Sequence, residues 1–125
     1  MVYTTTFFVW EIFINKNNMN FQASLGTGST QEQRIINASS WSTCLAYCEG
    51  TGLNITNIQV LSLVNIVQLD SETTDCYQGT IKVNGVATQY FVWANSFDSF
   101  NTWFDTLTNP VLQNIQFSNK LYVTV

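Results

Sequence analysis

The sequence loosely repeats itself, and this repeat constrains the fold more than any other feature. Residues 21–59 align with residues 77–116 at an offset of 56 positions, which becomes 57 after one added residue near the end. Internal similarity of this kind defines the structural unit before any residue is assigned a chemical role. Matched positions carry apolar residues of similar size, as in the pairs Phe21 and Tyr77, Ile36 and Val92, Trp41 and Phe97, and Tyr47 and Trp103. The alternative is two unrelated segments that share an order of elements, and it leads to a similar secondary-structure prediction.

Each copy predicts a strand, a tight turn, a second strand, a helix and a third strand. In the second copy, strands over 77–83 and 86–94 flank Asn84 and Gly85, a dipeptide that supplies the positive φ angles of a two-residue hairpin. The first copy has a glycine-rich stretch, 26–28, at the matching place. This stretch superficially resembles a phosphate-binding loop, but no lysine follows at the required spacing, so we expect a turn.

Each predicted helix begins at a polar residue that can cap its first turn. The candidates are Ser39 or Ser40 in the first copy and Asn95 or Ser96 in the second. A glycine at the end of the first helix and Pro110 after the second are suited to stopping them.

The apolar stripes of the two predicted helices also match. They consist of Trp41, Cys44 and Cys48 in the first copy and Phe97, Phe100 and Phe104 in the second. Because aromatic residues replace both cysteines, we interpret Cys44 and Cys48 as small buried hydrophobic residues rather than metal ligands. Cys76 has no predicted partner, and a disulfide to either of the other two cysteines is left open.

These elements predict one α+β domain over residues 1–125, with a mostly antiparallel sheet and two short helices. It comprises an N-terminal strand over 2–15, a first unit over 20–69 and a second unit over 76–125. The strand predicted over 55–69 would reach about 50 Å if unbroken. Either a bulge or bend interrupts it, or it links the two units. An all-β sandwich with two short helices is the alternative fold.

Composition narrows the classes of partner. Charged residues make up 10% of the chain, hydrophobic residues 46%, and the net charge is −4. An uncharged polar surface suits a protein that packs against copies of itself or a large assembly, although compositional drift gives the same pattern. The four basic residues do not cluster, so nucleic acid is not an expected partner. No apolar run is long enough for a membrane helix and no signal peptide is predicted, so no membrane partner is expected and the compartment stays open.

The sequence offers little catalytic chemistry. Histidine is absent, which removes the commonest general base and metal ligand. Asp70, Glu72 and Asp75 form an acidic cluster between the copies, but their spacing does not match a calcium loop, so we interpret it as a solvated loop, with a weak calcium site as the alternative. We therefore expect no catalytic residue, no metal site and no cofactor.

Three aromatic residues are the candidates for contact with a partner. Arg34 in the first copy is matched by Tyr90, and Asn37 is matched by Trp93, so both aromatics go beyond the shared pattern. Trp10 lies in the N-terminal strand, which has no place in the repeat. Exposed tryptophan and tyrosine favour protein interfaces and sugar stacking, whereas the alternative for Trp93 is packing in the interior.

The sequence therefore favours a non-enzymatic structural or assembly protein that forms homo-oligomers or packs on a larger assembly. A small phage virion component, such as a decoration or adaptor protein, is one such setting. The alternative is a small-ligand-binding or protein-sequestering inhibitor module with a pocket lined by Trp93, Tyr90 and Trp10. An enzyme that uses carboxylates is a third and less supported hypothesis.

Overall fold

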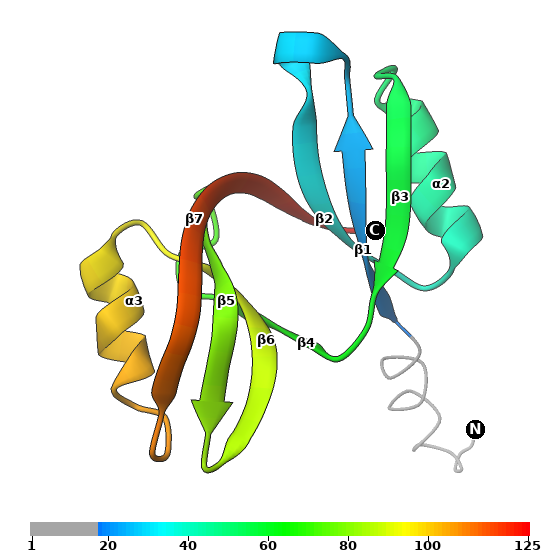
Figure 1. Ribbon diagram of the computed structural model, residues 1–125. Coiled ribbons are helices and arrows are strands. Elements are labelled where there is room, and N and C mark those ends of the chain that lie inside the picture. Colours follow the sequence, from blue (N-terminus) through cyan, green and yellow to red (C-terminus); the bar gives the residue numbers. More distant parts are fainter. Residues whose placement is uncertain (1–17) are drawn as a thin grey trace, which may run out of the picture. The chain divides into compact units, whose positions relative to one another are not determined.

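The computed structural model describes residues 18–125, so the predicted strand over 2–15 lies outside the described residues. The described elements form a mixed sheet of seven strands in the order β3-β1-β2-β7-β5-β6-β4, with two α-helices (Figure 1). In chain order the elements are β1 (Met19–Leu25), the short 3-10 helix η1 (Gly28–Thr30), β2 (Glu32–Ala38), α2 (Trp41–Gly50), β3 (Ile55–Leu61), β4 (Val64–Gln68), β5 (Asp75–Val83), β6 (Val86–Trp93), α3 (Phe97–Phe104) and β7 (Val111–Thr124). The predicted α+β class is confirmed.

The described chain divides into two compact units. Unit 1 holds the described residues up to Leu61 together with Tyr122–Val125, and unit 2 is Ser62–Leu121. These boundaries differ from the predicted units, 20–69 and 76–125, because residues 62–69 belong to unit 2 and Tyr122–Val125 belong to unit 1. Whether the two units behave as one folding domain stays a prediction.

In unit 1, β1 is the central strand and pairs antiparallel with both β2 and β3. Helix α2 begins after Ser40, whose side chain accepts a hydrogen bond from the backbone N of Thr43 at 3.2 Å. This cap satisfies one of the amide groups that the first helical turn leaves unpaired. The helix covers one face of the strands, and their shared core consists of Phe21, Ala23, Leu25, Ile36, Ala38, Cys44 and Cys48.

In unit 2, β5 is the central strand and pairs antiparallel with β6 and β7, while β4 pairs parallel with β6. The predicted hairpin between β5 and β6 is confirmed, since Asn84 and Gly85 have φ angles of 50° and 86°. Helix α3 begins after Ser96, which accepts from the backbone N of Ser99 at 3.2 Å. The core of unit 2 consists of Ile81, Val92, Ala94 and Phe100, with partly buried aromatic residues around them.

The two units use the same strand register at the positions that the repeat matches. Phe21 lies opposite Ile36 and Val60, and the matched Tyr77 lies opposite Val92 and Phe117. The register shifts between Ser24 and Leu25 in unit 1 and between Thr80 and Ile81 in unit 2, which are also matched positions. The order of elements, the serine caps and the irregular step in the ladder therefore agree in both units.

The long strand predicted over 55–69 is interrupted at residues 62–63. Leu63 has a φ angle of 57° and is 90% exposed, so the chain turns there in a conformation that a leucine rarely adopts. Before the interruption β3 pairs with β1 in unit 1, and after it β4 pairs with β6 in unit 2. Both alternatives that the sequence left open, a break and a link between units, describe this segment.

Candidate functional site

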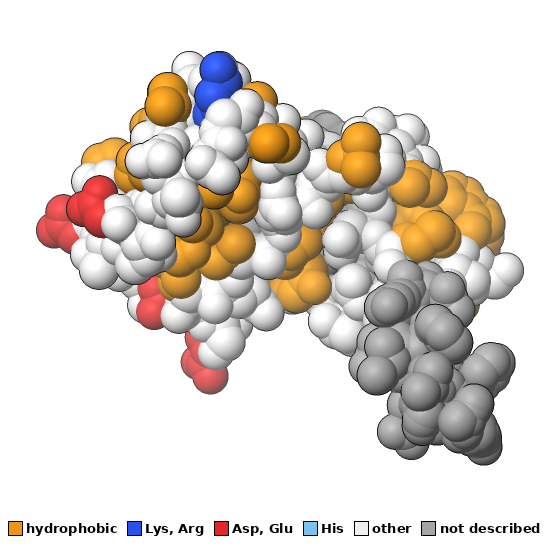
Figure 2. Space-filling model, turned by 90° about the horizontal axis from the view of Figure 1, so that it is seen from below, with side chains coloured by type: hydrophobic (Ala, Val, Ile, Leu, Met, Phe, Trp, Pro, Cys, Tyr) orange, Lys and Arg blue, Asp and Glu red, His pale blue; other side chains and the backbone are white. Residues whose placement is uncertain are grey.

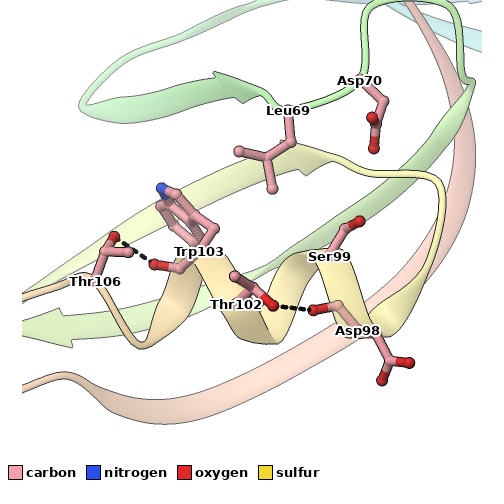
Figure 3. Close-up of a pocket in the computed structure, with 7 residues that line it drawn as sticks. All are labelled: Leu69, Asp70, Asp98, Ser99, Thr102, Trp103 and Thr106. Atoms are coloured by element: carbon pink, nitrogen blue, oxygen red, sulfur yellow. Dashed lines mark hydrogen bonds between the residues drawn. The ribbon is translucent and has the colours of Figure 1, made fainter.

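A wide, open groove of about 490 Å³ lies on unit 2. It lies between helix α3 and the chain that leaves β4, and it is lined by Leu69, Asp70, Asp98, Ser99, Thr102, Trp103 and Thr106 (Figure 3). Its volume falls within the range of small-ligand sites. Sequence reasoning did not identify this groove.

One stripe of α3 and the residues just after it provides most of the lining. Ser99, Thr102, Trp103 and Thr106 are spaced i, i+3, i+4 and i+7, which places them on one side of a helix. The hydroxyl of Thr102 donates to the backbone O of Asp98 at 2.9 Å, and that of Thr106 donates to the backbone O of Trp103 at 2.6 Å. Their oxygens keep lone pairs that can accept a hydrogen bond from a ligand.

The indole of Trp103 is held by two other rings. Its centroid lies 5.7 Å from that of Tyr90 and 5.7 Å from that of Phe100, both in tilted geometry. Phe100 is fully buried in the core of unit 2. Trp103 is therefore fixed in place, and the part of its ring that is not packed forms a wall of the groove.

Asp70 is fixed at both its backbone and its side chain. Its backbone N donates to the backbone O of Trp93 at 3.2 Å, and its Oδ2 accepts from the backbone N of Asn95 at 2.7 Å. Figure 3 shows its carboxylate pointing toward Ser99, whereas the carboxylate of Asp98 points away from Trp103 at the rim. The groove thus combines an aromatic wall, one fixed carboxylate and hydroxyl acceptors, with no basic residue in its lining.

Both units also expose apolar side chains at matched positions. We name Phe21, Trp41 and Val60 the unit 1 cluster, and Tyr77, Phe97 and Phe117 the unit 2 cluster. Trp41 and Val60 are 47% and 53% exposed, and the matched Phe97 and Phe117 are 48% and 55% exposed.

The ring at the centre of each cluster supports the exposed residues. The ring of Phe21 lies 6.0 Å from that of Trp41, and the ring of Tyr77 lies 6.0 Å from that of Phe97 and 5.3 Å from that of Phe117. Val60 and Phe117 are the cross-strand partners of Phe21 and Tyr77. Both units therefore have a half-exposed apolar cluster at the positions that the sequence alignment matches.

Of the three residues predicted to contact a partner, the structure describes two, Tyr90 and Trp93. Trp10 lies outside the described residues. Trp93 is fully buried, stacks on Phe91 at 6.3 Å and donates its indole N–H to the backbone O of Lys120 at 2.7 Å, as its packing alternative predicted. Tyr90 is half-buried on the opposite face of β6 from Trp93, and the contact of these residues with a partner stays a prediction.

The cysteines pack as the repeat predicted. Cys44 and Cys48 are fully buried in the core of unit 1, where burial and the neighbouring Cys48 raise the pKa of the Cys44 thiol to about 12. Burial also raises the pKa of Cys76 to about 12, and all three thiols are free. Reactive cysteines have lowered pKa values, so these thiols are suited to packing.

Within residues 18–125, no group of three or more acidic, cysteine or histidine side chains is arranged to hold a metal ion. No helix in the same range has the length and apolar character needed to cross a bilayer. Figure 2 shows orange apolar side chains between uncharged polar ones on one face, with few charged groups. Comparison with protein-family models, curated proteins and solved structures finds nothing that matches this chain.

Proposed function

We propose that the chain is a non-enzymatic structural or assembly protein that associates with copies of itself or packs on a larger assembly. The observation that carries the proposal is the pair of matched apolar clusters, which expose Trp41 and Val60 in unit 1 and Phe97 and Phe117 in unit 2 to nearly the same extent. Half-exposed aromatic residues fixed by their neighbours are typical of interface anchors.

The free energy of covering these clusters favours association. Each Å² of apolar surface removed from water contributes roughly 25 cal/mol, so an aromatic residue that becomes buried adds on the order of 1 kcal/mol or more. Two clusters in one chain also allow two-point attachment, which strengthens binding without any new kind of contact. Weak charge repulsion in a chain with 10% charged residues does not oppose such contacts.

The finer parts of the proposal follow from the same observations. The two units are copies of one ancestral strand-strand-helix-strand unit in which antiparallel pairing predominates, supported by their shared registers and serine caps. The partner is protein rather than nucleic acid or membrane, and a homo-oligomer is the expected state. A phage virion, with the chain as a decoration or adaptor protein, is a setting that fits such a surface.

The test is the mass of the full-length chain in solution. Light scattering after size exclusion at micromolar concentration should show an oligomer, and Trp41→Ser and Phe97→Ser should each shift the midpoint of association to about tenfold higher concentration. The control is Val86→Ser, which removes an exposed valine of the β5–β6 hairpin outside both clusters and should change nothing. A monomeric wild-type chain, or an equal effect of the control, would contradict self-association.

A second candidate function is a small-ligand-binding or protein-sequestering module. The groove on unit 2 supports it, because an aromatic wall beside a fixed carboxylate and hydroxyl groups can orient a ligand. The two candidates use different surfaces, so variants of the clusters and variants of the groove separate them.

A further inference from the structure

Unit 1 contains an internal example of how this fold holds a cation beside its helix. The guanidinium of Arg34 lies over the ring of Tyr47, with Cζ 5.9 Å from the ring centroid, and its Nη1 donates to the Tyr47 hydroxyl at 2.6 Å. Its Nε and Nη2 donate to the two carboxylate oxygens of Glu32 at 3.0 and 3.3 Å. An aromatic face with a paired carboxylate is the environment that suits a guanidinium.

Unit 2 has an aromatic residue at the position aligned with Tyr47 but no basic residue at the position aligned with Arg34. Trp103 matches Tyr47, but Tyr90 stands where unit 1 has Arg34 and packs against the indole at 5.7 Å. The groove opens beside Trp103, along the stripe of α3 that also contains Ser99 and Thr102. None of its lining residues is basic.

The groove instead has two carboxylates and no basic residue in its lining. The Oδ2 of Asp70 accepts from the backbone N of Asn95 at 2.7 Å, which fixes the carboxylate, and Asp70 lines the groove. Asp98 adds a second carboxylate at the rim. The described part of the chain contains one ion pair, Arg34 with Glu32, and neither groove carboxylate takes part in it. Charge complementarity therefore favours a cationic occupant.

We propose that the groove on unit 2 binds the guanidinium group of an arginine on a partner protein. The plane of the guanidinium stacks on Trp103, while its N–H groups donate to Asp70 and to the hydroxyl oxygens of Ser99 and Thr102. Lysine fits less well, because its ammonium group lacks the planar face and the forked donors that match this arrangement.

The partner is a different protein rather than a second copy of this chain. Arg34 is the single arginine in the sequence, and Glu32 and Tyr47 already engage its guanidinium. The inference therefore does not rest on self-association through the apolar clusters. It gives the second candidate function a chemical class of ligand.

The experiment titrates the full-length, isotope-labelled chain with N-acetyl-arginine-methylamide and follows the indole N–H signal of Trp103 by NMR. The signal is assigned from its loss in Trp103→Phe. We expect saturable shifts at millimolar concentration that weaken as salt is added. The matched probe is the citrulline analogue, which keeps the shape of arginine without its charge and should bind at least tenfold more weakly.

Matched variants test the carboxylate. Asp70→Asn keeps an oxygen for the backbone N of Asn95 but removes the charge, and we expect at least fivefold weaker binding of the arginine probe. Glu49→Gln removes the same charge from helix α2 of unit 1 and should leave the affinity unchanged. Equal binding of the citrulline probe, equal effects of the two variants, or no shift at Trp103 would overturn the proposal.

The outcome is independent of the proposed assembly function. Trp41→Ser and Phe97→Ser lie outside the groove lining and should bind the arginine probe with the affinity of the wild type. If they lose association but keep arginine binding, both proposals hold. Loss of association without any arginine binding in the wild type leaves the assembly proposal standing and rejects this one.

Discussion

At the residue scale, matched positions of the two units are buried in equivalent places although they carry different side chains. Cys44 and Phe100 both lie on the buried stripe of their helix, and both are excluded from solvent. Ala23 and Gly79 both lie in the central strand of their unit, and both are buried. Such pairs show which positions require a small residue and which require an apolar one, and each difference gives a separate prediction.

The thiol of Cys44 should make stability depend on pH in the alkaline range. Burial raises the pKa of Cys44 from 9.0 to about 12, so the folded state disfavours the thiolate. The free energy of unfolding is then unaffected by this group below pH 9 and falls as pH rises from 9 toward 12, by up to about 1.4 kcal/mol for each pH unit. Urea denaturation at a series of pH values should show a shallower fall for Cys44→Ala than for the wild type.

The wild type must be compared with Cys44→Ala because another group changes the free energy of unfolding with pH in the opposite direction. Burial lowers the pKa of Lys120, so its cost to the folded state disappears as pH rises toward 10.5. This contribution is common to the wild type and Cys44→Ala, and it cancels in their difference. Parallel pH profiles for the two proteins would show that the Cys44 thiol does not titrate in this way.

Gly79 should not tolerate a side chain. A Cβ atom at this position would overlap the backbone O of Asn114 on the neighbouring strand β7, next to the register shift after Thr80. We expect Gly79→Ala to lower the free energy of unfolding by about 1–3 kcal/mol through overpacking, measured by urea denaturation. Gly50→Ala is the control: its Cβ would meet no atom within 4 Å and alanine favours helices, so stability should stay the same or rise.

At the element scale, the two helices are started by the same device. Ser40 and Ser96 occupy matched positions, both have extended backbone angles, and both accept a hydrogen bond from the third residue of their helix at 3.2 Å. The sequence predicted a cap at each of these places without choosing between adjacent polar residues. The structure selects the serine immediately before the aromatic residue in both units.

Removal of either cap should therefore cost the same amount. We expect Ser40→Ala and Ser96→Ala each to lower the free energy of unfolding by about 1 kcal/mol, since each leaves a first-turn amide without its side-chain partner. Ser39→Ala changes an exposed neighbour that caps no backbone amide and should have little effect. A large loss of stability for Ser39→Ala would contradict the assignment of Ser40 as the cap of α2.

At the scale of the whole molecule, each unit contains a segment that follows the aligned stretch from which the other unit is mainly built. Residues 64–68 follow the first aligned stretch, 21–59, and pair with β6 in unit 2, whereas Tyr122–Val125 follow the second, 77–116, and belong to unit 1. The backbone N of Val125 donates to the backbone O of Asn37 at 2.9 Å. Unit 2 is therefore one continuous segment, whereas unit 1 combines two separate segments of the chain.

Deletion of Tyr122–Val125 should weaken unit 1 selectively. Each lost backbone hydrogen bond removes about 1 kcal/mol, so amide exchange in β2 should become about fivefold faster for each bond, while β5 and β6 keep their protection. The control replaces the four residues with alanine, which keeps the backbone groups and should preserve most of the protection of β2. Equal loss of protection in both units would show that the segment stabilises the chain as a whole.

The sequence by itself determined the local structure, because turns, caps and helix stripes depend on neighbouring residues. Asn84 and Gly85 form the hairpin, a polar residue caps each helix, and Cys44 lies buried at the position aligned with Phe100. These features follow from backbone conformation and periodicity, which a short stretch of sequence contains.

Only the tertiary structure decided where the predicted long strand is interrupted and which aromatic residues are exposed. The turn at Leu63, the burial of Trp93 and the groove between Asp70 and Trp103 arise from contacts between residues far apart in the sequence. A strand pattern alone cannot say which neighbour a strand will pair with or which of its faces will be covered. The pairing and the burial of each strand depend on the free energy of the complete set of packed contacts. A short stretch of sequence does not specify those contacts.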